Sequence, residues 1–119
     1  MSLSIKRVYE PRADGDGFRV LVDRLWPRGL AKDKAGVDLW LRDIAPSDEL
    51  RKWFGHEPAR WGEFRSRYLA ELAQGAALVA LDALRKVQGE HAVVTLLYAA
   101  HDEDRNNAVV LRDVLRPGG

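Results

Sequence analysis

AVVTLLYAA, residues 92–100, is the most apolar stretch of the chain and decides the expected fold. A short, continuous apolar run that contains β-branched residues is typical of a strand buried on both faces, as in a parallel or mixed sheet. Phe18–Val22 is a second run of this kind. Residues 4–10 alternate polar and apolar side chains up to Pro11, which predicts a further strand. We therefore expect a sheet with residues 92–100 as its central strand.

Apolar residues at three- and four-residue spacing predict helices between and after these strands. Ser47 is a suitable N-cap, because its hydroxyl can accept a hydrogen bond from an amide of the first turn. The elements that we expect are a helical turn at 30–35, a short strand at 39–44, a helix at 47–54, one broken helix or two helices between 58 and 89 with an interruption at Gly75, and a last helix at 108–115. This order predicts an α/β fold, a small, mostly parallel sheet flanked by helices.

The length and composition of the chain fit one domain over residues 1–119. Two domains in 119 residues would each be too small to bury an adequate core. Hydrophobic residues make up 46% of the chain and charged residues 31%, which argues against disorder. The net charge of +1 argues against a general nucleic-acid binder with a basic field over the whole domain.

Several kinds of chemistry are excluded or disfavoured by what the chain lacks. With no cysteine it has no disulfide, thiolate nucleophile or cysteine-bound metal. Its three histidines are dispersed without metal-ligand spacing, so we expect no transition-metal site, and no cofactor is indicated. No Walker loop or Gly-x-Ser-x-Gly elbow occurs. The chain begins without a signal peptide and contains no membrane span, which indicates a cytoplasmic protein.

Two polar loops follow the two most apolar strands, at 23–34 and 98–107. In open α/β sheets, ligands bind beyond the carboxyl ends of the strands, where such loops converge. The residues that we single out as a candidate site are Asp23, Arg24, Trp26, Arg28, Tyr98, Asp102 and Asn106. If the two strands run in the same direction, both loops lie at one edge of the sheet.

Each candidate has a role in binding or catalysis. Arg24 and Arg28 offer guanidinium donors to a phosphate or carboxylate, and Trp26 offers a ring for stacking. Asp23 or Asp102 would be the general acid, general base or orienting group. Tyr98 and Asn106 would position the ligand.

Structural alternatives exist for several of these side chains. In the first loop, Asp23 would pair with an arginine at the edge of the core and Trp26 would fill the core. This structural explanation has the same weight as the functional one. In the second, the acidic triplet 102–104 and the nearby asparagines would cap the last helix, which accounts for much of their polarity. His56, between two expected helices, would be a general base or would bind loop carbonyls, and the second explanation is favoured.

The chain resembles the domain-of-unknown-function 488 (DUF488) family over nearly its whole length. Four ordered motifs carry the resemblance: residues 19–29 (RVLVDRLWPRG), 43–47 (DIAPS), 53–56 (WFGH), and 96–108, which contain LLYAA, Asp102 and Asn-Asn-Ala. The resemblance implies an α/β fold and brings no settled activity with it. It also matches Asp23, Arg24, Arg28 and Asp102 to the short members of the family.

The resemblance departs from the family pattern at other positions. Other branches carry cysteines around Tyr98 and Asn106, so a thiol-dependent mechanism does not carry over to this chain. His101 and Arg105 are atypical, because the resemblance implies lysine and histidine there.

Two hypotheses for the function remain open. The first is an enzyme-like domain that binds an anionic small molecule, such as a nucleotide or nucleic-acid component, between the two loops. The alternative is a non-catalytic binding or regulatory module for nucleic acid or a protein partner. A steep fall of affinity with salt would indicate several phosphate contacts, whereas an apolar protein interface would respond weakly.

Overall fold

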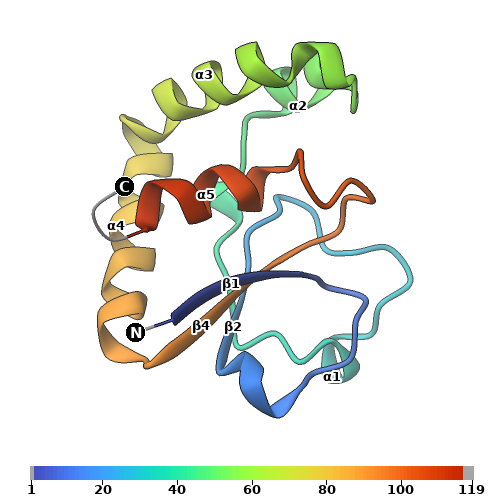
Figure 1. Ribbon diagram of the computed structural model, residues 1–119, viewed down its shortest axis with the longest axis vertical. Helices are drawn as coiled ribbons and strands as arrows, with labels where there is room; N and C mark the ends of the chain where they lie inside the picture. The colour runs from blue at the N-terminus through green and yellow to red at the C-terminus, as the bar shows by residue number, and fades with distance from the viewer. Residues whose placement is uncertain (1, 117–119) are drawn as a thin grey trace.

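A computed structural model describes residues 2–116, and its centre is a sheet of four strands that all pair in parallel (Figure 1). The spatial order is β1-β4-β2-β3, and the strands are β1 (Ser2–Arg7), β4 (Val93–Tyr98), β2 (Phe18–Leu21) and β3 (Leu39–Trp40). In the register of the sheet, Leu96 lies between Ile5 and Val20. The predicted α/β fold and the central position of the 92–100 stretch are confirmed.

Two of the expected strands have different ends in the structure. Residues 39–44 pair only at Leu39 and Trp40, and the strand prediction is wrong for 42–44, which form a 3-10 turn, η2 (Arg42–Ile44). The Tyr68 hydroxyl donates to the carbonyl of Ile44, a tertiary contact that is invisible in the local pattern. The first strand ends at Arg7 instead of Glu10, because the chain turns there and the Glu10 amide donates to the Arg7 carbonyl.

The predicted helices are all present in residues 2–116, and the segment between 58 and 89 is two helices. The elements are η1 (Asp14–Asp16), α1 (Lys32–Ala35), α2 (Asp48–Phe54), η3 (Pro58–Arg60), α3 (Trp61–Leu72), α4 (Gly75–Glu90) and α5 (Asn107–Leu115). Ser47 caps α2 as expected, since the Leu50 amide donates to its hydroxyl at 3.2 Å. No helix within residues 2–116 combines the length and apolarity needed to cross a membrane.

The two faces of the sheet are covered differently. Val94 and Leu96 belong to the main core, which also contains apolar side chains of α2, α3, α4 and α5. Leu97 belongs to a second, smaller core on the opposite side, with Trp26 and Trp40 packed against it. The helices from α2 onward therefore cover one face, while the loops that follow β1 and β2 cover the other.

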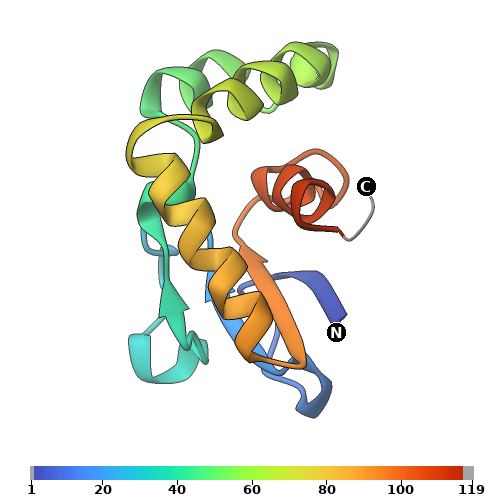
Figure 2. The same cartoon turned by 90° about the vertical axis from the view of Figure 1, so that its left-hand side faces the viewer.

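Helices α2 and α3 lie side by side beyond the end of the sheet, and α4 leads back along it (Figure 2). Glu71 on α3 accepts hydrogen bonds from both the amide and the hydroxyl of Ser47, at 2.8 and 2.6 Å. This contact fixes the start of α2 against α3. The α2–α3 layer is thereby held over the carboxyl ends of β2 and β4, where the polar loops begin.

Gly17 allows the chain to enter β2 at a point where it passes very close to β4. Its φ angle is +64°, and a Cβ atom there would lie 2.3 Å from the carbonyl oxygen of Val93. A side chain would therefore be strained by the backbone angle and would also collide with a strand.

Candidate functional site

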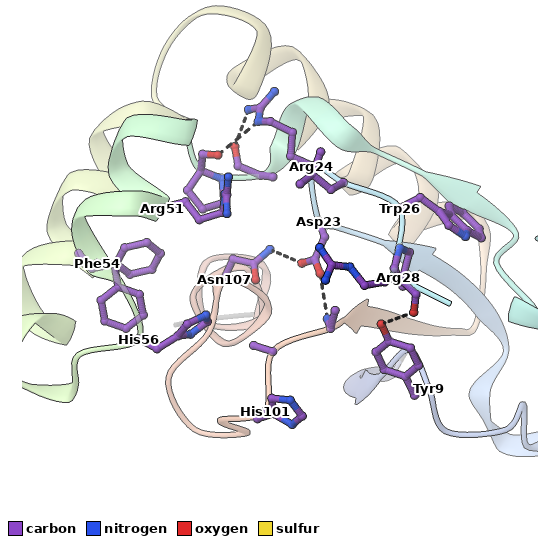
Figure 3. Close-up of a pocket in the computed structure, with 17 residues that line it drawn as sticks. Tyr9, Asp23, Arg24, Trp26, Arg28, Arg51, Phe54, His56, His101 and Asn107 are labelled. Carbon is purple, nitrogen blue, oxygen red and sulfur yellow. Dashed lines mark hydrogen bonds between the residues drawn. The ribbon is translucent and has the colours of Figure 1, made fainter. Parts of the chain in front are cut away.

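A cleft of about 550 Å³ opens at the carboxyl ends of β2 and β4 (Figure 3). It is lined by residues of both polar loops and of the α2–α3 layer. The charged and imidazole side chains in its lining are Asp23, Arg24, Arg28, Arg51, His56 and His101. Its apolar wall includes Pro46, Phe54 and Phe64. Three guanidinium groups thus share the cleft with a single carboxylate.

Asp23 lies where β2 ends, and it connects three elements. Its Oδ2 accepts from the amide of Ala99 at 2.8 Å, just beyond β4, and its Oδ1 accepts from the Asn107 side chain at 3.1 Å, on α5. Burial raises the pKa of the Asp23 carboxyl, and these two hydrogen bonds offset part of that rise. Within residues 2–116, Asp23 makes no ion pair, so the alternative in which it pairs with an arginine at the core edge is wrong.

Asn107 lines the cleft, although it was not among the predicted site residues. Its amide nitrogen donates to the carbonyl of Val22 at 2.9 Å and to Asp23. Asn106, which was selected, is instead the N-cap of α5: the Val109 amide donates to its Oδ1 at 3.0 Å. The only signal in the sequence was that two asparagines are adjacent at the start of the last helix.

The three arginines of the cleft are held to different degrees. Arg24 donates to the carbonyls of Ala45 and Pro46, at 3.1 and 3.4 Å, which ties the β2 loop to the start of the α2–α3 layer. The exposed guanidinium of Arg28 has no hydrogen-bond or ion-pair partner among the described residues. Arg51, on α2, makes an exposed contact of 3.4 Å with Asp48. Arg28 and Arg51 are therefore the two arginines whose donors are mostly available.

Trp26 lines the cleft and also packs into the second core. Its indole nitrogen donates to the carbonyl of Leu30 at 2.7 Å, and its ring meets the edge of Trp40 at 5.4 Å. Lys32 lies over the ring at 5.8 Å. Trp26 thus packs beneath its loop, as the structural alternative predicts. Part of its side chain also borders the cleft.

Tyr98, Asn106 and Asp102 lie outside the lining of the cleft. Tyr98 is 2% exposed, and burial, with the nearby negative charge of Glu103, raises the pKa of its hydroxyl. Asp102 accepts from the amides of Asp104 and Arg105, at 2.9 and 3.0 Å, and these hydrogen bonds lower the pKa of its carboxyl. The structure therefore brings together Asp23, Arg24, Trp26 and Arg28, and it separates the other three candidates from them.

His56 reaches the cleft through an unusual backbone conformation. Its φ angle is +59°, and it is the only non-glycine residue with a positive φ among residues 2–116. It follows Gly55, which is also left-handed at +53° and ends α2. Such a conformation is rare for a residue with a side chain, and it turns the imidazole toward the cleft, where the ring lies 6.2 Å from that of Phe54.

No cluster of three or more His, Asp or Glu side chains that could bind a metal ion occurs within residues 2–116. The chemistry available in the cleft is therefore that of guanidinium and imidazole donors, one buried carboxylate and an apolar wall.

Comparison with known proteins places the chain in a family. The chain is 46% identical to the uncharacterized protein YeaO of Escherichia coli over 120 residues, which cover 98% of each chain. It is 48% identical to the uncharacterized protein Rv3073c of Mycobacterium tuberculosis over 111 residues, 93% of this chain and 91% of the relative. No solved structure matches the chain significantly. A family model described as the inactive DUF488-N3 subclade matches residues 2–117, so the chain belongs to the DUF488 family.

Proposed function

We propose that this protein binds a small anionic molecule in the cleft at the carboxyl ends of β2 and β4, and that it does so without transforming the molecule. The observation that carries the proposal is the available guanidinium groups of Arg28 and Arg51 at a cleft that holds only one carboxylate. Guanidinium groups donate in a planar fork that suits phosphate and carboxylate.

The arrangement of the cleft supports binding of a molecule of moderate size. Its volume of about 550 Å³ lies within the range of small-molecule sites. Arg24 would hold the two sides of the cleft in position through its bonds to Ala45 and Pro46, rather than bind the ligand with its whole guanidinium. The rings of Phe54 and Phe64, stacked with centroids 4.4 Å apart, would contact an apolar part of the ligand.

Two observations favour binding without catalysis. The family model that matches this chain is described as an inactive subclade. In addition, both oxygens of Asp23 already accept hydrogen bonds from Ala99 and Asn107, which suits a carboxylate that holds loops together. Asp102, Tyr98 and Asn106 play no part in this proposal, since each is bonded or buried elsewhere.

One observation favours the enzyme-like alternative, with Asp23 as general acid or base. A carboxyl with a raised pKa in a cleft is the kind of group that enzymes use for proton transfer. The two functions differ in the fate of the ligand. Incubation of a bound ligand with stoichiometric protein, followed by NMR, returns the ligand unchanged if the protein only binds and gives a product if Asp23 is catalytic.

A thermal-shift screen against nucleotides, sugar phosphates and small carboxylates tests the proposal, because a ligand of the native state raises the apparent melting temperature. For any ligand found, Arg28→Ala should weaken binding about tenfold or more, the usual effect of losing a hydrogen bond to a charged group. Arg85→Ala is the matched control, because Arg85 is exposed on α4, outside the cleft. Equal losses in the two variants, or no shift with any anion, would refute the proposal.

The salt dependence of the affinity separates a small ligand from nucleic acid. A polyanion that contacts several arginines would lose affinity steeply as salt rises, with a slope that grows with the number of phosphate contacts. A single small anion would show a slope of about one or less.

A further inference from the structure

Apart from Tyr9, Arg24 and Trp26, whose side chains donate to backbone carbonyls, the polar side chains of the cleft are divided by hydrogen-bonding type. Two of them form the floor, Asp23 and Asn107, which are joined by a hydrogen bond (Figure 3). Four exposed side chains form the rim: Arg28, Arg51, His56 and His101. The floor and the rim differ in what they can offer a ligand.

The side chains of the floor have no N–H donor left for a ligand. A side-chain amide has two N–H hydrogens, and Asn107 uses both, one to Val22 and one to Asp23. The amide of Ala99, the neighbouring backbone donor, is used by the other oxygen of Asp23. A ligand atom that contacts these two side chains therefore meets acceptors.

Three acceptor oxygens remain open at the floor. Each carboxylate oxygen of Asp23 accepts one of the roughly two hydrogen bonds it can take. The Oδ1 of Asn107 accepts from no described residue. It is also not sealed from solvent, because the only fully buried, unpartnered side-chain polar atoms within residues 2–116 are the Nε atoms of Arg19 and Arg112. Asn107 lines the cleft, so this oxygen faces it.

The rim has the opposite character. A guanidinium has five N–H donors and no acceptor, and Arg28 makes no side-chain bond within the described residues. Arg51 makes a single exposed contact, 3.4 Å from Asp48. A negatively charged end of a ligand is therefore favoured at the rim and opposed at the floor.

We propose, building on the function proposed above, that the ligand is an anion that carries paired N–H donors at its opposite end. A guanidinium group has such donors, and so has a heterocycle in which a ring N–H is adjacent to an amino group. Either would pair with the Asp23 carboxylate in the two-bond arrangement that planar donors make with carboxylates. The anionic group would then lie at the rim, near Arg28.

The electrostatics of the floor support this orientation. Burial makes ionisation of Asp23 unfavourable and raises the pKa of its carboxyl. A donor from the ligand would stabilise the carboxylate where no arginine or lysine of the described chain does so. A ligand with only acceptors at that end would displace water from the floor oxygens without replacing its hydrogen bonds, which costs binding energy.

Matched ligand pairs on the unmodified protein test the inference by calorimetry. Guanosine monophosphate is compared with adenosine monophosphate, which lacks the ring N–H, and arginine is compared with norvaline, which lacks the guanidinium. We expect the donor-bearing member of at least one pair to bind at least about tenfold more tightly. Guanosine and agmatine, which lack the anion, should bind more weakly than guanosine monophosphate and arginine. The pair that shows the preference identifies the source of the donors.

Two outcomes contradict the inference in distinguishable ways. If both members of each pair bind equally, the site selects the anion only, and the proposed function survives while this inference fails. If none of these molecules binds, this inference fails, and the thermal-shift screen described above decides the proposed function separately. Arg28→Ala adds an independent check on orientation: it should remove the advantage of the monophosphate over guanosine and leave the preference for paired donors intact.

Discussion

Replacing Asn107 with aspartate should make the stability of the protein strongly dependent on pH. The substitution keeps the shape of the side chain and removes both N–H donors, so the carbonyl of Val22 and the carboxylate of Asp23 each lose a partner. A carboxylate oxygen would stand 3.1 Å from Asp23 where an amide nitrogen now stands. Two charges at that distance repel by about 5 kcal/mol at an effective dielectric constant of about 20.

The pair would avoid much of this repulsion by holding one proton, so its shared pKa in the folded state would lie above that of the unfolded chain. A carboxyl pKa raised by folding makes the native state less stable as pH rises through that value, and this loss disappears as pH falls. We expect Asn107→Asp to lower the free energy of unfolding by about 3–5 kcal/mol at pH 8 and by about 1–2 kcal/mol at pH 5.

Urea unfolding followed by tryptophan fluorescence, at four pH values between 5 and 8, measures this difference against the unmodified protein. The matched control is Asn106→Asp, since aspartate serves equally well as an N-cap and Asn106 does not touch Asp23. The control should show a small loss that is constant over this pH range. A loss in Asn107→Asp that is equally constant would show that the Asp23–Asn107 contact does not exist in solution.

Two further predictions concern Gly17, where the chain enters β2, and the carboxyl group of Asp16. Gly17→Ala should lower the free energy of unfolding by about 2 kcal/mol or more, because of the positive φ angle and the nearby Val93 carbonyl. Gly62→Ala, in α3 with nothing within 4 Å, should raise it by about 0.5–1 kcal/mol. Thermal unfolding compares the two variants, and equal effects would contradict the close approach of Gly17 to Val93. Burial opposes the ionisation of Asp16, but hydrogen bonds from Ala13, Lys6 and Arg19 outweigh it and lower the pKa of its carboxyl. The stability that Asp16 contributes should therefore be present above the pKa of the unfolded chain and be lost as pH falls below about 4. An Asp16→Asn variant that loses stability in acid as steeply as the unmodified protein would contradict this.

The strands were predictable because burial on both faces leaves a strong mark on the sequence. Residues 92–100 and 18–22 contain few polar side chains, and both form strands at the centre of the sheet. The length predicted for β3 was too great, because contacts between residues far apart in the chain leave no mark on the local sequence. The strand ends at Trp40, and the carbonyl of Ile44 accepts a hydrogen bond from Tyr68, 24 residues further along the chain, a contact that no local pattern encodes.

One part of the cleft could be predicted from the sequence, because the loop that forms it follows a strand directly. Asp23, Arg24, Trp26 and Arg28 lie in one loop, and the parallel sheet fixes the edge at which that loop begins. Which of two adjacent asparagines faces the cleft depends on the exact residue at which α5 starts, a detail that sequence patterns do not resolve.

Another part of the cleft comes from the α2–α3 layer. Arg51 and His56 reach the cleft through the packing of α2 against α3, to which the Glu71–Ser47 hydrogen bonds and the stacked Phe54 and Phe64 rings contribute. Contacts between residues this far apart in the chain arise from tertiary packing. The spacing of polar residues near 51 and 56 carried no sign of them.

The strand order also constrains how the protein is made. β1 and β2 are not neighbours, and each reaches the other only through β4, which ends at Tyr98. A nascent chain that has not yet released residues 93–98 from the ribosome can form helices α3 and α4, but β1 then has no partner and β2 can pair only with the two residues of β3. β1, and the edge of β2 that pairs with β4, must therefore wait for residues 93–98, which makes the interval before that point the one in which exposed strand edges are open to wrong pairing.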